Sequence, residues 1–225
     1  MRPSARDFLA MSKKIKIIIP VVIILLVLIA VGIFYWWQWK RELPQEKIIQ
    51  KRIPVDSAEY EIKDTPEGKI VENKKEGLTV KAPAGWIVEK YGEEVDLLSP
   101  ETEFDQYGGV SLKSVREKGA CGMAIQILKY EKVDPEITTY AEDLRTLIEE
   151  AQNNPVKEET AKSEVVMISK KLGFKRTSLK EDKETYISVE IPVNHTVYGF
   201  YSGLIFSEKC VQEFNKILET VSINK

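Results

Sequence analysis

Two cysteines are the residues of this sequence best suited to covalent chemistry. Cys121 precedes an apolar segment at 123–130, and Cys210 falls in the first turn of a predicted helix that begins at Ser207. In an oxidising compartment such a pair favours a disulfide, which would close a loop of about 89 residues. Two alternatives stay open. The N–H groups of the helix N-terminus could activate the Cys210 thiol, or both thiols could be buried and unpaired.

The other polar residues show no catalytic or metal-binding pattern. The single histidine, His195, follows Asn194 in a predicted turn, where a solvated role is the simpler interpretation. Neighbouring carboxylates occur as Glu93–Glu94, Glu149–Glu150 and Glu158–Glu159, which is typical of solvated surfaces. We therefore predict no catalytic residue, no metal site and no cofactor.

Aromatic residues gather near the C-terminus in the segment 196–206. Tyr198, Phe200 and Tyr201 lie in one predicted strand, and side chains alternate between the two faces of a strand. Some of them must pack in the core, and those on the other face form a candidate binding surface. Trp86 is the only tryptophan outside the N-terminal region, and we interpret it as a core residue.

One apolar segment near the N-terminus predicts a membrane anchor. The run from Ile17 to Trp37 contains no charged residue and is long enough to cross a hydrocarbon core of about 30 Å. An aromatic belt of Tyr35, Trp36, Trp37 and Trp39 lies at the end of the run, and Lys40 and Arg41 follow, as expected at a membrane interface. No A-x-A cleavage site follows the run, so we predict an uncleaved transmembrane signal anchor at residues 17–37.

The distribution of charge favours one orientation of this anchor. Residues 1–52 carry ten Lys/Arg and three Asp/Glu, whereas the remainder is acidic. Basic residues flank both ends of the apolar run, so the positive-inside rule alone decides little. We expect residues 1–16 to be a cytoplasmic basic tail, with Met1 or Met11 as the start, and the C-terminal domain to be extracytoplasmic. The acidic domain makes nucleic acid an unsuitable partner.

The rest of the chain divides into a tether and a domain. Residues 38–67 are rich in charge and contain Pro44, Pro54 and Pro66, so we predict a spacer. Residues 68–225 alternate in hydropathy with a period of two and predict strands, interrupted by helical periodicity at 137–151 and after 207. The predicted strands are 77–83, 86–90, 94–100, 108–115, 122–131, 163–169, 174–180, 185–193 and 196–206. This order indicates an α+β fold with an antiparallel sheet flanked by helices.

The opening of the domain resembles a known family. The segment from Asn73 to Trp86, NKKEGLTVKAPAGW, resembles the start of PsbP-like domains, and the order of later elements over about residues 68–225 is also similar. The resemblance implies an α/β/α sandwich. It also implies a binding or assembly accessory rather than an enzyme, although a fold alone does not fix a function.

Three functions follow as hypotheses. The first is a non-enzymatic domain of the bacterial cell envelope, held in the cell membrane by a single-pass helix, that binds a protein or assists an assembly. The second is a module that binds a small molecule or lipid, and the third is a hydrolase or thiol redox enzyme. A flat apolar patch with aromatic residues would favour the first, and a pocket with convergent polar groups would favour the second or third.

Overall fold

The computed structural model describes residues 26, 28, 29, 31, 32, 50–153, 161–180, 183–202 and 207–225. The chain divides into two compact units, Met1–Lys47 and Ile48–Lys225. In the first unit the described residues are helical. Within the described part of the chain, no helix is both long enough and apolar enough to span a membrane. The predicted anchor at 17–37 lies largely outside that part.

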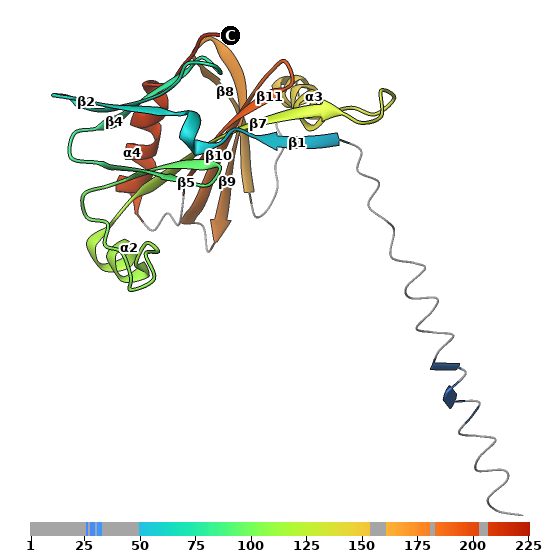
Figure 1. The fold of residues 1–225 in the computed structure, drawn as a ribbon, viewed down its shortest axis with the longest axis horizontal. Helices are drawn as coiled ribbons and strands as arrows, with labels where there is room; N and C mark the ends of the chain where they lie inside the picture. The colour runs from blue at the N-terminus through green and yellow to red at the C-terminus, as the bar shows by residue number, and fades with distance from the viewer. Residues whose placement is uncertain are drawn as a thin grey trace, which may run out of the picture. The chain divides into compact units, whose positions relative to one another are not determined.

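A large antiparallel sheet forms the centre of the second unit (Figure 1). The order of its strands is β5 (Ile87–Tyr91), β6 (Glu94–Leu98), β7 (Gly122–Lys132), β11 (Thr196–Ser202), β10 (Lys183–Val193), β9 (Lys171–Lys180) and β8 (Ala161–Ile168). A further strand, β1 (Gln50–Pro54), pairs with residues 128–132 of β7, while β6 pairs with residues 122–126. Because β11 occupies the opposite edge of β7, β1 and β6 share one edge in succession.

A smaller antiparallel sheet packs beside it. Its order is β12 (Ser222–Ile223), β4 (Leu78–Pro83), β3 (Gly68–Asn73) and β2 (Glu61–Thr65). A short 3-10 helix, η2 (Ser57–Glu59), connects β1 to β2, and the Asp56 carboxylate caps it by accepting from the Ala58 N–H at 2.8 Å. The strands β1 and β2 are therefore part of the second unit, since β1 pairs with β7 and β2 pairs with β3.

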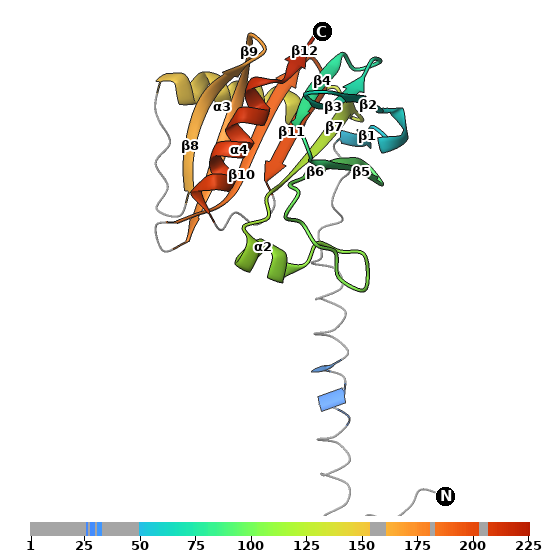
Figure 2. The same cartoon turned by 90° about the vertical axis from the view of Figure 1, so that its left-hand side faces the viewer.

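Helices cover both faces of the large sheet (Figures 1 and 2). One face packs against α4 (Glu208–Glu219) and the small sheet, and this main core contains alternate residues such as Ile187, Val189 and Ile191. The other face, which we call the outer face, packs against α3 (Tyr140–Asn153) through Leu144 and Ile148. The α+β arrangement with an antiparallel sheet between helices is therefore the observed fold.

Most of the alternating segments form strands as predicted, and the Asn194–His195 turn joins β10 to β11. The predicted strand at 108–115 is wrong, because residues Leu112–Lys118 form the helix α2, which ends at Gly119 with a positive φ of 68°. A helix of two turns is too short for helical periodicity to be distinguished from the alternation of Val110 and Leu112.

The predicted tether is wrong for residues 50–67, because β1 and β2 belong to the two sheets. Charged edge strands lack the strict alternation that identifies a half-buried strand. The start of the central helix also differs from the prediction, since the helical periodicity begins at 137 and α3 begins at Tyr140.

Candidate functional site

The outer face of the large sheet carries an unusual row of polar and small residues. Cross-strand pairing places Asp96 opposite Ala124, Ala124 opposite Tyr201, Tyr201 opposite Ser188, and Ser188 opposite Arg176. Because side chains alternate along each strand, all five project to the outer face. The part of this row nearest α3 forms the floor of a cavity.

This cavity, which we call the α3 cavity, lies between α3 and strands β9 and β10, and its volume is about 550 Å³. Leu144, Leu147 and Phe174 form an apolar wall. Ser188 and Glu190 of β10 are polar residues of the lining, and Glu190 pairs with Phe174 across β9 and β10. The remaining lining residues are Tyr140, Asp143, Arg176, Ser178 and Tyr186.

Two tyrosine hydroxyls converge on the Glu190 carboxylate at this cavity. Tyr140 donates to Oε2 at 2.6 Å and Tyr201 donates to Oε1 at 2.9 Å. The Tyr201 ring lies over Gly199, since a Cβ atom built on that glycine would be 2.3 Å from the Tyr201 hydroxyl. The glycine thus permits the side chain to fold back along its own strand toward Glu190.

The electrostatics favour binding over acid–base chemistry at these tyrosines. Burial, followed by the neighbouring Glu190 carboxylate, raises the pKa of both Tyr140 and Tyr201. Both hydroxyls therefore stay protonated near neutral pH and continue to donate to Glu190. The arrangement offers a fixed carboxylate and fixed hydroxyls beside an apolar wall, which suits recognition of a molecule with polar and apolar parts.

Local interactions hold α3 in the position that this geometry needs. Thr139 and Glu142 form a reciprocal cap, in which the Thr139 N–H donates to the Glu142 carboxylate at 2.7 Å and the Glu142 N–H donates to the Thr139 hydroxyl at 3.4 Å. The Tyr140 N–H donates to the Gln50 side chain in β1 at 2.7 Å. The Tyr140 ring also packs on Tyr130, with centroids 5.4 Å apart. The strand β1 therefore helps to position a cavity residue.

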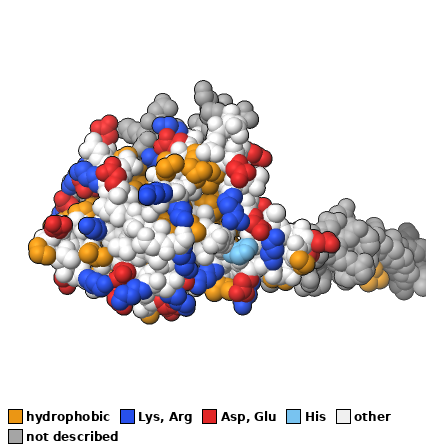
Figure 3. All heavy atoms as spheres, turned by 90° about the horizontal axis from the view of Figure 1, so that it is seen from above, with side chains coloured by type: hydrophobic (Ala, Val, Ile, Leu, Met, Phe, Trp, Pro, Cys, Tyr) orange, Lys and Arg blue, Asp and Glu red, His pale blue; other side chains and the backbone are white. Residues whose placement is uncertain are grey.

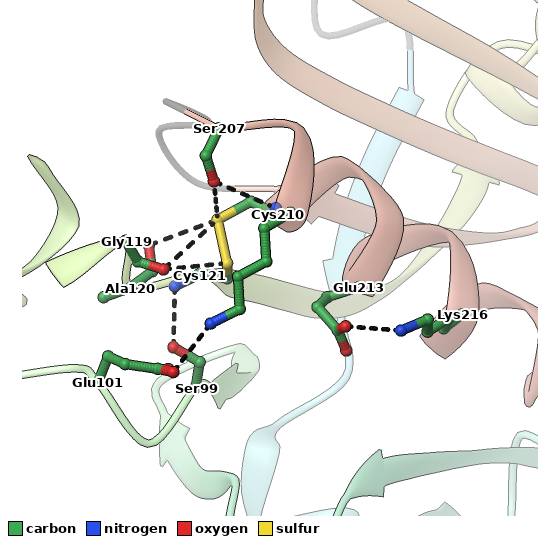
Figure 4. Close-up of polar contacts among 10 residues, drawn as sticks. Ser99, Glu101, Gly119, Ala120, Cys121, Ser207, Cys210, Glu213 and Lys216 are labelled. Atoms are coloured by element: carbon green, nitrogen blue, oxygen red, sulfur yellow. Dashed lines mark hydrogen bonds and ion pairs between the residues drawn. A yellow bond between two sulfur atoms is a disulfide. The ribbon is translucent and has the colours of Figure 1, made fainter.

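The predicted disulfide is present. Cys121 and Cys210 are joined with an S–S distance of 2.06 Å and a Cα–Cα distance of 5.2 Å (Figure 4). The Cys121 N–H donates to the Ser99 hydroxyl at 3.0 Å, and Ser207 caps α4 by accepting from the Cys210 N–H at 3.3 Å. The bond ties the start of β7 to the first turn of α4 and leaves neither sulfur as a thiol.

The structure does not support the predicted aromatic binding surface. Tyr198 and Phe200 are 0% exposed and lie in the main core, so the prediction is wrong for both. The Tyr198 hydroxyl donates to the Glu76 backbone carbonyl at 2.6 Å. Tyr201 occupies the outer face instead, where it contacts Glu190. Successive side chains of β11 point to opposite faces of the sheet, so Tyr198 and Phe200 enter the main core whereas Tyr201 projects to the outer face.

The other residues singled out from the sequence lie apart from the α3 cavity. Trp86 is buried in the main core, as predicted. His195 is exposed in the β10–β11 turn, and Figure 3 shows the pale blue histidine at the surface near basic side chains. Within the described residues, no group of three or more His, Cys, Asp or Glu side chains is placed to hold a metal ion.

The cavity residues were not identified from the sequence. Tyr140, Arg176 and Glu190 are distant along the chain. Tyr140 belongs to the apolar periodicity of 137–151, whereas Arg176 and Glu190 have the polar character expected of solvent-facing strand positions. The one available signal is Glu190, which is the only charged residue of the segment 185–193, TYISVEIPV. Only the pairing of β9, β10 and β11 shows that these side chains meet.

Comparisons with known proteins give little further information. No family model matches the chain, and no curated protein sequence matches it. Among the solved structures to which the chain is similar is the crystal structure of LpqN, a protein involved in cell envelope biogenesis of Mycobacterium tuberculosis. The identity is 13%, the TM-score is 0.41, and the match covers 78% of this chain and 92% of that chain. A likeness of this extent carries no functional argument, so the resemblance to PsbP-like domains stays a prediction.

Proposed function

We propose that this protein is a membrane-anchored, extracytoplasmic binding module and that the α3 cavity is its ligand site. The observation that carries the proposal is the convergence of Tyr140 and Tyr201 on Glu190, which lines a cavity that also has apolar residues. The predicted anchor at 17–37 supports the location. The proposal favours the second hypothesis from the sequence, because the aromatic patch expected of the first is largely buried.

The dimensions of the α3 cavity support a small molecule as its occupant. Ligand sites typically have volumes of about 300–1,000 Å³ and combine apolar walls with a few oriented polar groups. The cavity of about 550 Å³ falls in this range. The Glu190 carboxylate of β10 is held by two other elements, since Tyr140 comes from α3 and Tyr201 from β11. Such preorganisation lowers the entropic cost of binding.

The test is recovery of a molecule that copurifies with the protein. We expect native mass spectrometry of the full-length protein, extracted from its own membranes, to show a bound mass. Ser188→Leu, which fills the cavity, should remove this mass, and Glu190→Gln should reduce it. Tyr91→Phe, at an exposed tyrosine remote from the cavity, is the control and should retain it. A bound mass that Ser188→Leu leaves unchanged would contradict the proposal.

A second candidate is binding of a protein partner along β8. This strand is the last in its sheet among the described residues, so its outward backbone groups are available for pairing. Met167 in β8 is 71% exposed, which is unusual for a large apolar side chain. An extended segment of another protein could add to the sheet at this edge.

Crosslinking separates this candidate from the first. A photoreactive amino acid at Met167 should capture a specific neighbour in native membranes if β8 is an interface. The same amino acid at Tyr91, on the opposite edge of the sheet, is the matched control. Capture of no specific protein from Met167 would count against the partner-binding role and leave the cavity proposal intact.

A further inference from the structure

The lining of the α3 cavity carries more negative than positive charge. Asp143 and Glu190 are its acidic residues, and Arg176 is the one basic residue of its described lining. No ion pair joins the Glu190 carboxylate to a lysine or arginine among the residues that the structure describes. The hydroxyls of Tyr140 and Tyr201 that donate to it are neutral, so its negative charge stays uncompensated. The cavity therefore favours a ligand with a positive charge.

Neighbouring carboxylates on the outer face add to this negative field. Cross-strand pairing through β7 and β11 places Glu94 of β6 in the same row as Glu190. Burial, followed by the carboxylates of Glu190 and Glu94, raises the pKa of Tyr186, another residue of the cavity lining. Further along β6, burial, together with Glu94 and Glu89, raises the pKa of Asp96 to about 6. A cation in the cavity would thus meet a negative field wider than the lining itself.

Aromatic rings form a large part of the same lining, since Tyr140, Phe174 and Tyr186 belong to it. A cation is attracted to the electron-rich face of an aromatic ring. The Tyr140 hydroxyl donates to the Glu190 carboxylate at 2.6 Å, which polarises the phenol and increases the electron density of its ring. Negative charge beside several aromatic rings is the combination that recognises quaternary ammonium groups.

The hydrogen bonds at Glu190 favour a quaternary ammonium over other cations. Each of its carboxylate oxygens already accepts a hydrogen bond from a tyrosine. A primary ammonium brings three N–H donors that need acceptors, and calcium or magnesium needs about six oxygen ligands. A quaternary ammonium has no N–H group, so it interacts through its charge and its methyl groups. The apolar side chains of Leu144 and Leu147 suit such methyl groups and an attached carbon chain.

We propose that the ligand of the α3 cavity carries a quaternary ammonium group, bound between the Glu190 carboxylate and the aromatic rings of the lining. This inference rests on the proposed function, because it names the chemistry of the ligand expected at that site. The same group occurs in lipid headgroups and in free solutes, and these two sources are distinguished by comparing a soluble lipid with choline.

Methyl NMR of the full-length protein in dodecyl maltoside, which contains no ammonium group, tests the site with choline chloride as the probe. With ¹³C-methyl leucine, we expect a saturable shift of the Leu147 resonance, assigned with Leu147→Met, and no shift of Leu78 in the main core. The neutral isostere 3,3-dimethylbutan-1-ol should bind at least about tenfold more weakly. Ethanolamine, the primary ammonium analogue, should bind at least about threefold more weakly.

Dihexanoylphosphatidylcholine, used below its critical micelle concentration, identifies the source of the group. Tighter binding of this lipid than of choline assigns the group to a lipid headgroup, since the acyl chains then add contacts with the apolar residues of the cavity. Equal or weaker binding assigns it to a free solute. Both results require the saturable shift with choline, so both support the quaternary ammonium site.

Matched variants identify the groups responsible. Glu190→Gln should weaken binding of choline by about tenfold and leave binding of 3,3-dimethylbutan-1-ol unchanged. Tyr186→Phe keeps the ring and should bind choline as the wild type does, whereas Tyr186→Leu should weaken binding several-fold. Asp64→Asn, an equal charge change at an exposed position of β2, is the control and should have no effect.

Several results would overturn the inference. They are binding of choline that is no tighter than that of its neutral isostere or of ethanolamine, undiminished binding of choline by Glu190→Gln, and absence of a saturable Leu147 shift in the folded wild-type protein. A copurifying molecule that Ser188→Leu displaces but that contains no quaternary ammonium group would also overturn it. That last result would leave the α3 cavity as the ligand site, so the two proposals fail separately.

Discussion

Glu76 is a carboxylate that the domain buries almost completely, since only 1% of its side chain is exposed. Lys129 and Lys225 each place Nζ 2.5 Å from one of its carboxylate oxygens. Its backbone N–H donates to the Asn73 side chain at 3.0 Å, and its carbonyl accepts from Tyr198. The residue therefore connects the β3–β4 turn to β7, β11 and the C-terminal residue.

We expect Glu76→Gln to lower the free energy of unfolding by about 2–3 kcal/mol at pH 7, because it leaves two lysines without their shared partner. Burial alone would raise the pKa of Glu76, but Lys129 and Lys225 outweigh it and hold the pKa below its usual range. The stabilisation is therefore present above the unfolded pKa of about 4.3 and is lost as pH falls through the folded pKa.

Urea unfolding of wild type and Glu76→Gln at pH 7, 5 and 3.5 measures this effect, and the difference should narrow at low pH. Glu61→Gln is the control, since its ion pair with Lys74 lies at the surface. An equal loss of stability at every pH would show that packing, and not charge, explains the effect of the variant.

Asp96 is expected to show the opposite pH dependence. Its folded pKa of about 6 lies above the unfolded value of about 3.9, so ionisation as pH rises between these values disfavours the folded state. Asp96→Asn should therefore stabilise the protein at pH 8 and have little effect near pH 4. Urea unfolding of wild type and Asp96→Asn at pH 8 and pH 4 measures this effect. The same difference in unfolding midpoint between the two proteins at both pH values would contradict the expectation.

At the scale of elements, β1 is the segment whose role differs most from its appearance in the sequence. It pairs with β7, and the residue that follows it, Val55, is buried in the main core. Val55→Asp should lower stability by about 4 kcal/mol or prevent folding, because it places an unpaired charge in the core. Lys51→Asp, at an exposed position of β1, should be nearly neutral. Thermal unfolding of the two variants and wild type measures these effects. If residues 50–55 were a spacer, Val55→Asp would leave the unfolding temperature unchanged, as Lys51→Asp does.

The disulfide is an element-scale constraint between β7 and α4. In the chain-entropy model, closing a loop of this size contributes up to about 4–5 kcal/mol. Replacing Cys121 and Cys210 with alanine should lower the urea midpoint by a corresponding amount. The wild-type midpoint should fall to a similar value in reductant, and the double variant should not respond to it. A wild-type midpoint insensitive to complete reduction would contradict this expectation.

The elements that could be predicted from the sequence are those with one buried face. β4 and the second half of β10 alternate because one side of each strand enters the main core, and β7 was recognised from its apolar residues Met123, Ile125 and Ile127, which enter the same core. β1 and β2 were missed because edge strands tolerate Lys, Asp and Pro. The α3 cavity was missed for a different reason: it depends on the register between β9, β10 and β11, and no local pattern along a single segment contains that information.

At the scale of the whole molecule, attachment to the membrane stays a prediction from the sequence. Placing Leu25→Lys and Leu28→Lys in the predicted span should release the protein from carbonate-washed membranes, since each lysine costs about 2.5–3.5 kcal/mol at the centre of a spanning helix. Gln38→Lys with Gln45→Lys, outside the span, is the control and should stay in the pellet. Recovery of the wild-type protein entirely in the supernatant after the carbonate wash would contradict the predicted anchor.

The disulfide also limits how far this domain can be stretched. When tension is applied between Ile48 and Lys225, the segment between the two cysteines stays closed as a loop with a sequence separation of 89. At about 3.6 Å per residue, the unravelled chain would extend roughly 320 Å with the bond intact and roughly 640 Å after its reduction. A single-molecule pulling experiment would therefore report the oxidation state of the sulfurs as a contour length.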